Sequence, residues 1–107
     1  MIVKYLKGGE HPDIALTWKD NSGAIIDFAT GYTFELKIGH GGQAALITKT
    51  AGITGAQTAP NVTTIFAVNE LDTIATGLYE AQLRARQTST SKDRYMRFWF
   101  LLIPAVA

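Results

Sequence analysis

The chain has 107 residues, of which 47% are hydrophobic and 18% charged, a balance that fits one globular domain with a single core. Ten basic residues against nine acidic ones give a net charge of +1, which argues against a dedicated nucleic-acid binder, because such proteins normally carry a basic stripe. The absence of cysteine excludes a disulfide framework and any thiolate metal site.

The first part of the chain alternates extended segments with turn residues. Residues 1–7 are expected to form an arm or a short edge strand, and residues 13–19 alternate apolar and polar side chains, as a strand with one buried face requires. Residues 20–23 (DNSG) predict a hairpin-type turn, because asparagine and glycine tolerate positive φ angles. A brief strand or extended link is expected at residues 24–28, and a second clean strand at residues 32–38.

The middle of the chain is less regular. We expect a strand at residues 44–50, a loop with room for a short strand at residues 51–60, and a β-rich strand at residues 61–68. Residues 69–75 contain helix formers but predict at most one short helical turn, because the segment is too short for an independent helix.

The clearest pattern in the chain is the alternation over residues 78–87, which follows a turn at Gly77 and predicts a strand with one buried face. Its start resembles the tyrosine corner of immunoglobulin domains, in which a Tyr two places after a Gly bonds back to nearby backbone. Gly77 and Tyr79 occupy those positions, while Ala75 replaces the usual aspartate and Ala81 the cysteine of antibody domains. The pattern indicates a structural role for Tyr79.

The number and spacing of these segments predict the fold class. About seven or eight short strands, with turn signals roughly every 8–12 residues, are typical of a sandwich. We therefore expect an all-β protein, an immunoglobulin-like antiparallel β-sandwich of about seven strands that forms one domain over residues 1–107. The N-terminus has no apolar run long enough for a signal peptide, and no stretch approaches the roughly 20 apolar residues of a membrane helix.

Residues that could perform chemistry are scattered. His11 and His40 lie in separate turns without a ligand partner at metal-site spacing, so each is expected to be a solvated turn residue. Glu35 and Glu80 lie on outward faces of different strands, and a glycosidase pair stays open from sequence although such carboxylates are usually only solvated. We expect no catalytic, cofactor-binding or metal-binding residue and no enzymatic activity.

The last expected strand, residues 94–103, is apolar on both faces from Phe98 onward. One face can fill the core, and the other would carry Tyr95, Arg97, Trp99, Leu101 and Ile103. Aromatic residues with an arginine have the composition of an interface core. We therefore predict a protein contact formed by Tyr95, Arg97, Trp99 and Leu101. The alternative is that the N-terminal arm or a loop of the same chain covers this face.

Three blocks together resemble the immunoglobulin-like N-terminal domain of phage baseplate upper proteins and related small phage tail proteins. They are residues 12–27 (PDIALTWKDNSGAIID), residues 31–38 (GYTFELKI) and residues 77–83 (GLYEAQL), and their order and spacing are similar to that family's. The resemblance implies a non-enzymatic structural component of a tailed-phage virion, such as a tail, baseplate or neck adaptor. It implies other virion proteins and further copies of the chain as partners, without nucleic acid or membrane, and assembly in the bacterial host cytoplasm.

A second function class is a carbohydrate-binding β-sandwich module. Trp18, Trp99 or Tyr95 would then form the platform on which a sugar stacks. Trp18 falls in register with Ile14 and Leu16, however, which is more typical of a core residue.

Overall fold

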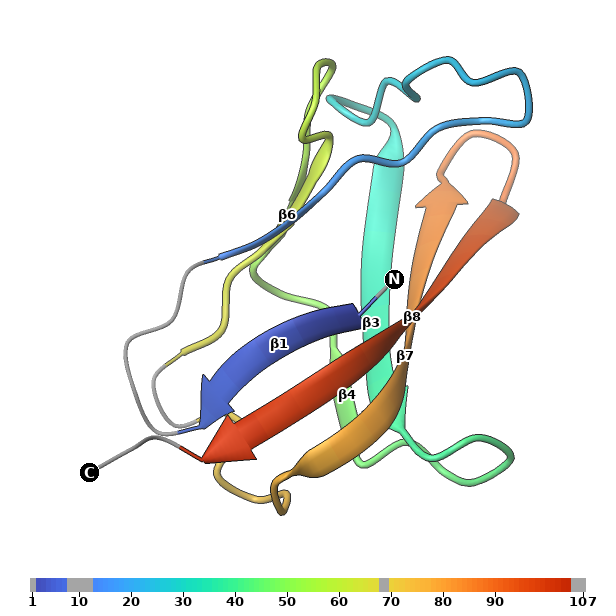
Figure 1. Cartoon of the computed structure of the whole chain (residues 1–107). Coiled ribbons are helices and arrows are strands. Elements are labelled where there is room, and N and C mark those ends of the chain that lie inside the picture. Colours follow the sequence, from blue (N-terminus) through green and yellow to red (C-terminus); the bar gives the residue numbers. More distant parts are fainter. Residues whose placement is uncertain (1, 8–12, 68–69, 105–107) are drawn as a thin grey trace.

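The computed structural model describes residues 2–7, 13–67 and 70–104, which form an all-β structure (Figure 1). The strands in these ranges are β1 (Ile2–Lys7), β2 (Ile14–Leu16), β3 (Tyr32–Gly39), β4 (Ile47–Lys49), β5 (Ile53–Gly55), β6 (Val62–Thr64), β7 (Gly77–Gln87) and β8 (Lys92–Pro104). This part of the chain contains no helix: residues 70–74 form turns where at most one helical turn was expected near residues 69–75, and residue 69 lies outside the described ranges.

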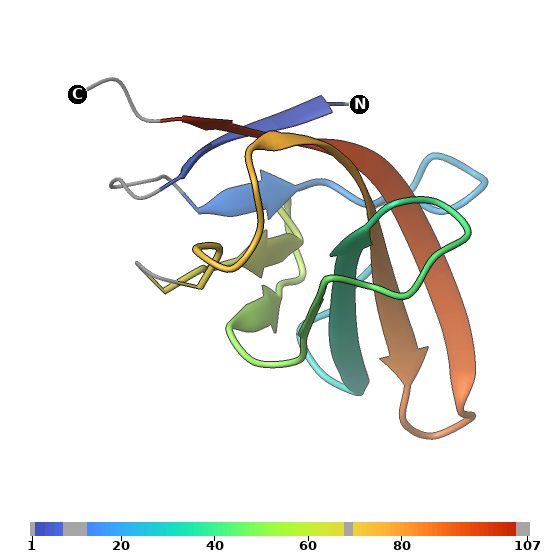
Figure 2. The same cartoon turned by 90° about the horizontal axis from the view of Figure 1, so that it is seen from below.

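The strands form two open sheets that pack together, consistent with a β-sandwich. The larger sheet has the order β1-β8-β7-β3-β4, and the smaller one has the order β2-β6-β5. Figure 2 shows the long strands of the five-stranded sheet curving over the three-stranded sheet. The predicted all-β class is therefore confirmed.

A long hairpin of β7 and β8 forms the centre of the larger sheet. Its register runs from Gly77 opposite Leu102 to Gln87 opposite Lys92, and residues 88–91 form the connecting turn. β3 pairs antiparallel with the other side of β7 along its whole length. Each of these three strands buries one face, and in β3 and β7 that face follows a regular alternation of apolar and polar residues.

The core lies between the two layers and contains two aromatic clusters. Tyr5 of β1 contacts Phe66 and Phe100, with ring centroids 5.2 and 5.7 Å away. The second cluster is centred on Phe28, whose ring lies 4.8 to 5.4 Å from those of Trp18, Tyr32 and Phe34. Aromatic pairs at such distances add to the stabilisation that burial provides.

β1 corrects the expectation of an entirely antiparallel sandwich. It pairs in parallel with β8, with Ile2 opposite Trp99 and Tyr5 opposite Leu102. Because the two strands come from opposite ends of the chain, no hairpin turn fixes the direction in which they pair. β1 extends the sheet at its edge and does not cover the outer side of β8, so the alternative of a covering N-terminal arm is wrong for the described residues.

Several strands are shorter than the sequence pattern predicts. The expected strands at residues 13–19, 44–50 and 61–68 contain only β2, β4 and β6, of three residues each, and residue 68 lies outside the described ranges. Residues 24–28 form an extended link with a single bridge between Ile25 and Lys19. Alternation reports which side chains are buried, whereas a strand also needs a neighbour whose backbone it can pair with.

Candidate interaction surface

The outer face of the five-stranded sheet, the side that points away from the three-stranded sheet, carries every second residue of β8. The buried set on the inner side is Phe98, Phe100 and Leu102. The set on the outer side contains the residues predicted to form a contact: Tyr95, Arg97, Trp99 and Leu101. The two faces of β8 therefore follow the alternation in the sequence.

Large apolar side chains gather at one end of this outer face. Trp99 is 44% exposed, Leu78 of β7 is 49% exposed and Ile2 of β1 is 58% exposed. The strand register places Ile2 directly opposite Trp99, and Leu78 directly opposite the half-buried Leu101. These four residues from three adjacent strands are called the Trp99 patch below.

The other end of the outer face is polar. Arg86 donates hydrogen bonds from Nε and Nη2 to the two carboxylate oxygens of Asp93, at 2.7 and 3.1 Å, and this contact holds the pKa of Asp93 below its usual value. The Tyr95 hydroxyl donates to Asp93 Oδ2 at 3.3 Å. Tyr95 lies four residues from Trp99 along β8, roughly 13 Å at the usual rise of a strand. Of the residues predicted to form one contact, Trp99 and Leu101 therefore lie together in the apolar part of the outer face, whereas Tyr95 lies in its polar part.

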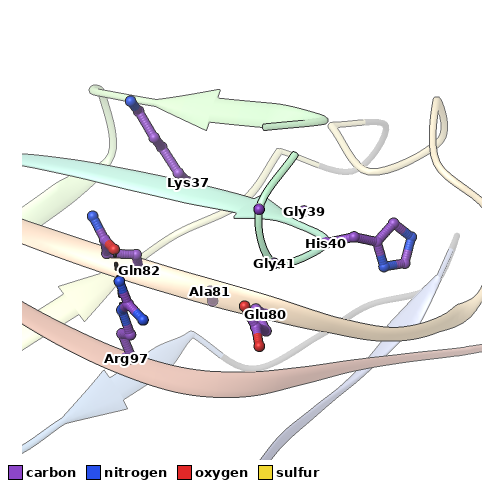
Figure 3. Close-up of a pocket in the computed structure, with 9 residues that line it drawn as sticks. Lys37, Gly39, His40, Gly41, Glu80, Ala81, Gln82 and Arg97 are labelled. Carbon is purple, nitrogen blue, oxygen red and sulfur yellow. Dashed lines mark hydrogen bonds between the residues drawn. The ribbon is translucent and has the colours of Figure 1, made fainter. Parts of the chain in front are cut away.

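Arg97 lies between the two parts and borders two shallow hollows. The first, of about 180 Å³, lies between the 39–42 loop and the outer face, where Arg97 Nε donates to Gln82 Oε1 at 3.3 Å (Figure 3). The second, of about 210 Å³, is lined by Trp99 together with Glu80, Arg97 and Phe98. The loop lies so close to β7 that a Cβ on Gly41 would come within 2.5 Å of Glu80 Oε2.

The carboxylates and histidines of the described residues do not form a metal or glycosidase constellation. No group of three His, Cys, Asp or Glu side chains that could hold a metal ion occurs in the described ranges. His40 is exposed and its ring lies 4.9 Å from that of Tyr79, whereas His11 lies outside the described ranges. Glu35 pairs with Arg84, four residues along β7 from Glu80. This offset is roughly 13 Å along the strands, longer than the two-carboxylate mechanism uses.

The corner at the start of β7 has a defined geometry. The Tyr79 hydroxyl donates a hydrogen bond to the Ala75 carbonyl oxygen at 2.5 Å, the local backbone contact that the Gly-x-Tyr pattern predicts. Gly77 has a φ of 155°, a backbone conformation that residues other than glycine rarely adopt. We therefore assign both residues a structural role. Tyr79 is buried and does not contribute to the outer face.

Two residues of the Trp99 patch were missed in the sequence. Leu78 has the same parity as Glu80, so the alternation in β7 already places it on the outer side. Ile2 carried no such signal, because its position beside Trp99 depends on the parallel pairing of β1 with β8.

Comparison with known proteins adds no family to this geometry. No protein-family model, curated protein or solved structure matches the chain. None of the segments that the structure describes is a helix long and apolar enough to cross a membrane.

Proposed function

We propose that this protein is a non-enzymatic structural component of a tailed-phage virion, which acts through protein–protein contacts at its outer sheet face. The observation that carries the proposal is the Trp99 patch, in which exposed apolar side chains of three strands adjoin one another beside Arg97. Contiguous apolar surface of this kind is characteristic of interaction sites, and tryptophan and arginine are enriched among the residues that dominate binding.

The assignment to a virion is supported by the sequence resemblance to the immunoglobulin-like domain of phage baseplate upper proteins. The proposed fold is accordingly an immunoglobulin-like variant, with β1 added in parallel at one edge. Other virion proteins and further copies of the chain are the proposed partners, and the tail, baseplate or neck is the proposed location. The proteins of a virion are exposed to water before they assemble. Their contact surfaces must therefore be stable in water and also apolar enough to bind a neighbouring protein.

The second candidate is a carbohydrate-binding module. It is favoured by the hollow of about 210 Å³ in which the Trp99 ring lies beside Glu80 and Arg97, since an aromatic face with flanking polar groups suits a sugar ring. Trp18 cannot contribute to this platform, because it is only 7% exposed and belongs to the core.

The experiment is the substitution Trp99→Ser in the phage or prophage that encodes the chain, with mass spectrometry of purified particles. We expect the variant protein to fold, with a loss of about 1 kcal/mol or less in its free energy of unfolding, and to be depleted from particles. Truncating a dominant contact residue weakens binding by about 2 kcal/mol or more. Ile65→Ser is the matched control, because Ile65 is 49% exposed but follows β6 of the other sheet.

Two outcomes would contradict the virion proposal. One is wild-type protein that is absent from purified particles. The other is incorporation that Trp99→Ser leaves unchanged. Sugar-dependent quenching of tryptophan fluorescence that Trp99→Ser abolishes would favour the carbohydrate-binding module.

A further inference from the structure

Half of β3 has an unpaired edge. β7 pairs with β3 from Tyr32 to Gly39, whereas β4 covers the opposite edge only at Leu36–Ile38. After Lys49 the chain leaves this edge and continues to β5 in the other sheet. The first half of β3, residues 32–35, therefore has no neighbouring strand on the edge opposite β7.

The free edge offers specific backbone groups. The carbonyl oxygen of Ile38 accepts a hydrogen bond from the Leu46 amide at 2.9 Å, so Ile38 directs its backbone groups to the β4 side. Alternate residues of a strand direct their N–H and C=O groups to the same side, which places those of Tyr32 and Phe34 on the free edge. Within the described residues, none of these four groups has a hydrogen-bond partner. Unpaired strand edges of this kind are templates for a further strand.

A cleft runs along this edge. Its volume of about 570 Å³ is within the usual range of ligand sites. Its apolar walls come from both layers: Phe28 and Ile53 on one side, Tyr32 and Phe34 on the other. Gly55 allows β5 to lie close to Phe28, because a Cβ on Gly55 would collide with the backbone of Phe28.

Arg84 gives the cleft a charged rim. It lies on the outer side of β7 opposite Glu35, and its side chain reaches the cleft as one of the lining residues. The guanidinium Nη2 is 3.8 Å from Glu35 Oε2, but the Nε atom is buried and has no hydrogen-bond partner. The guanidinium is partly exposed and only loosely paired with Glu35, so it favours a ligand that supplies a carboxylate oxygen.

We infer that this cleft binds an extended peptide of a partner protein, which adds a strand to the free edge of β3. Its backbone pairs with Tyr32 and Phe34, as in other cases of β-strand addition. Successive side chains of a strand point to opposite sides. Two apolar side chains of the peptide would therefore point between the layers toward Phe28 and Phe34, and the side chain of the peptide residue that separates these two would point outward to Arg84. The recognised pattern is apolar, acidic, apolar. This inference is independent of the Trp99 patch, which lies on the same sheet's β1, β7 and β8.

The test is a selection of random nonapeptides by mRNA display on the full chain. We expect enrichment of peptides in which aspartate or glutamate lies between two apolar residues. For a selected peptide, replacing that acid by its amide should weaken binding about tenfold, as should Arg84→Met in the protein. Arg94→Met removes an arginine charge at an exposed position of β8, and it should leave the binding of the peptide unchanged. The amide change in the peptide tests the contact even where Arg84→Met impairs folding.

Two further measurements locate the peptide. In hydrogen exchange followed by NMR, the backbone amides of Tyr32 and Phe34 should become protected when the peptide binds. N-methylation of the peptide residues that pair with β3 should abolish binding while the side chains stay the same. Failure to enrich any peptide would overturn the inference, as would binding that leaves these amides unprotected or is equally strong for the acid and the amide.

Discussion

The two sheets of this protein are stabilised in different ways. In the larger sheet, the 11-residue β7 and the 13-residue β8 form long backbone ladders and bury alternate side chains. In the smaller sheet, β2, β5 and β6 are three residues each, too short for backbone pairing alone to hold them. The difference shows that regular pairing and buried side-chain hydrogen bonds can do the same structural task in one domain.

One buried side-chain amide lies at the end of the smaller sheet. Asn61 is 0% exposed, and its Nδ2 donates to the carbonyl oxygens of Trp18 and Ile26, each at 2.8 Å. Its Oδ1 accepts from the Trp18 amide at 2.7 Å. Asn61 thus joins the end of the smaller sheet to two segments that no ladder reaches. A separate contact is the ion pair between Lys49 of β4 and Glu70, at 2.8 Å, which attaches the 70–74 turns to the larger sheet.

The largest expected effect is in the core of the larger sheet. Phe100→Ala should lower the free energy of unfolding by about 3–5 kcal/mol, because Phe100 is 0% exposed and its loss leaves a cavity. Urea denaturation would measure it. The neighbouring Trp99→Ala is the control, and equal losses for the two would contradict the assignment of faces along β8.

The next effect sharpens the comparison directly. Asn61→Ala should cost about 3 kcal/mol, because the Trp18 amide and the Ile26 carbonyl are left buried without a partner. Asn21→Ala, at an exposed turn residue, should be nearly neutral. If Asn61→Ala is also neutral in thermal melts, the smaller sheet does not depend on this amide.

A third effect is a dependence on alkaline pH. Burial, with the nearby Asp13 and Glu70 carboxylates, raises the pKa of Tyr5 to about 12. An unfolded tyrosine releases its proton near pH 10, so between roughly pH 10 and 12 the unfolded chain holds fewer protons and stability falls as the pH rises. The contribution of Tyr5 to the free energy of unfolding, roughly 2 kcal/mol, is fully present below pH 10. Denaturation curves at several pH values should show a smaller decline for Tyr5→Phe, and an identical decline would refute this origin.

The smallest effect concerns the corner of β7. Tyr79→Phe should cost about 1 kcal/mol, because it removes the single hydrogen bond from the hydroxyl to the Ala75 carbonyl. Tyr95→Phe, whose hydroxyl bonds Asp93 at the exposed surface, should cost much less. Equal urea midpoints for wild type and Tyr79→Phe would show that the corner adds no stability.

The same contrast explains which parts of the fold and site were predictable. The alternation over residues 32–38, 78–87 and 94–103 gave the three long strands and the inner and outer sides of each. It therefore placed Trp99 and Leu101 on the outer face correctly. It did not reveal Asn61, because a single asparagine before a β-rich run has the same local appearance whether it is buried or solvated. The short strands were overestimated because alternation shows which side chains are buried, and it does not show how far a neighbouring strand continues beside them.

What the sequence determined by itself is the class of structure and the side of each long strand that is buried, because the period of two is a local property of the backbone. Only the tertiary structure decided which strands are neighbours. It placed Ile2 beside Trp99 through a parallel pairing of strands from the chain's two ends. It also left residues 32–35 paired with β7 on one edge and with no strand on the other, where the chain leaves β4 for the other layer. Both surfaces arise from contacts between distant segments, and the hydrogen bonds that form or fail to form there depend on the whole chain.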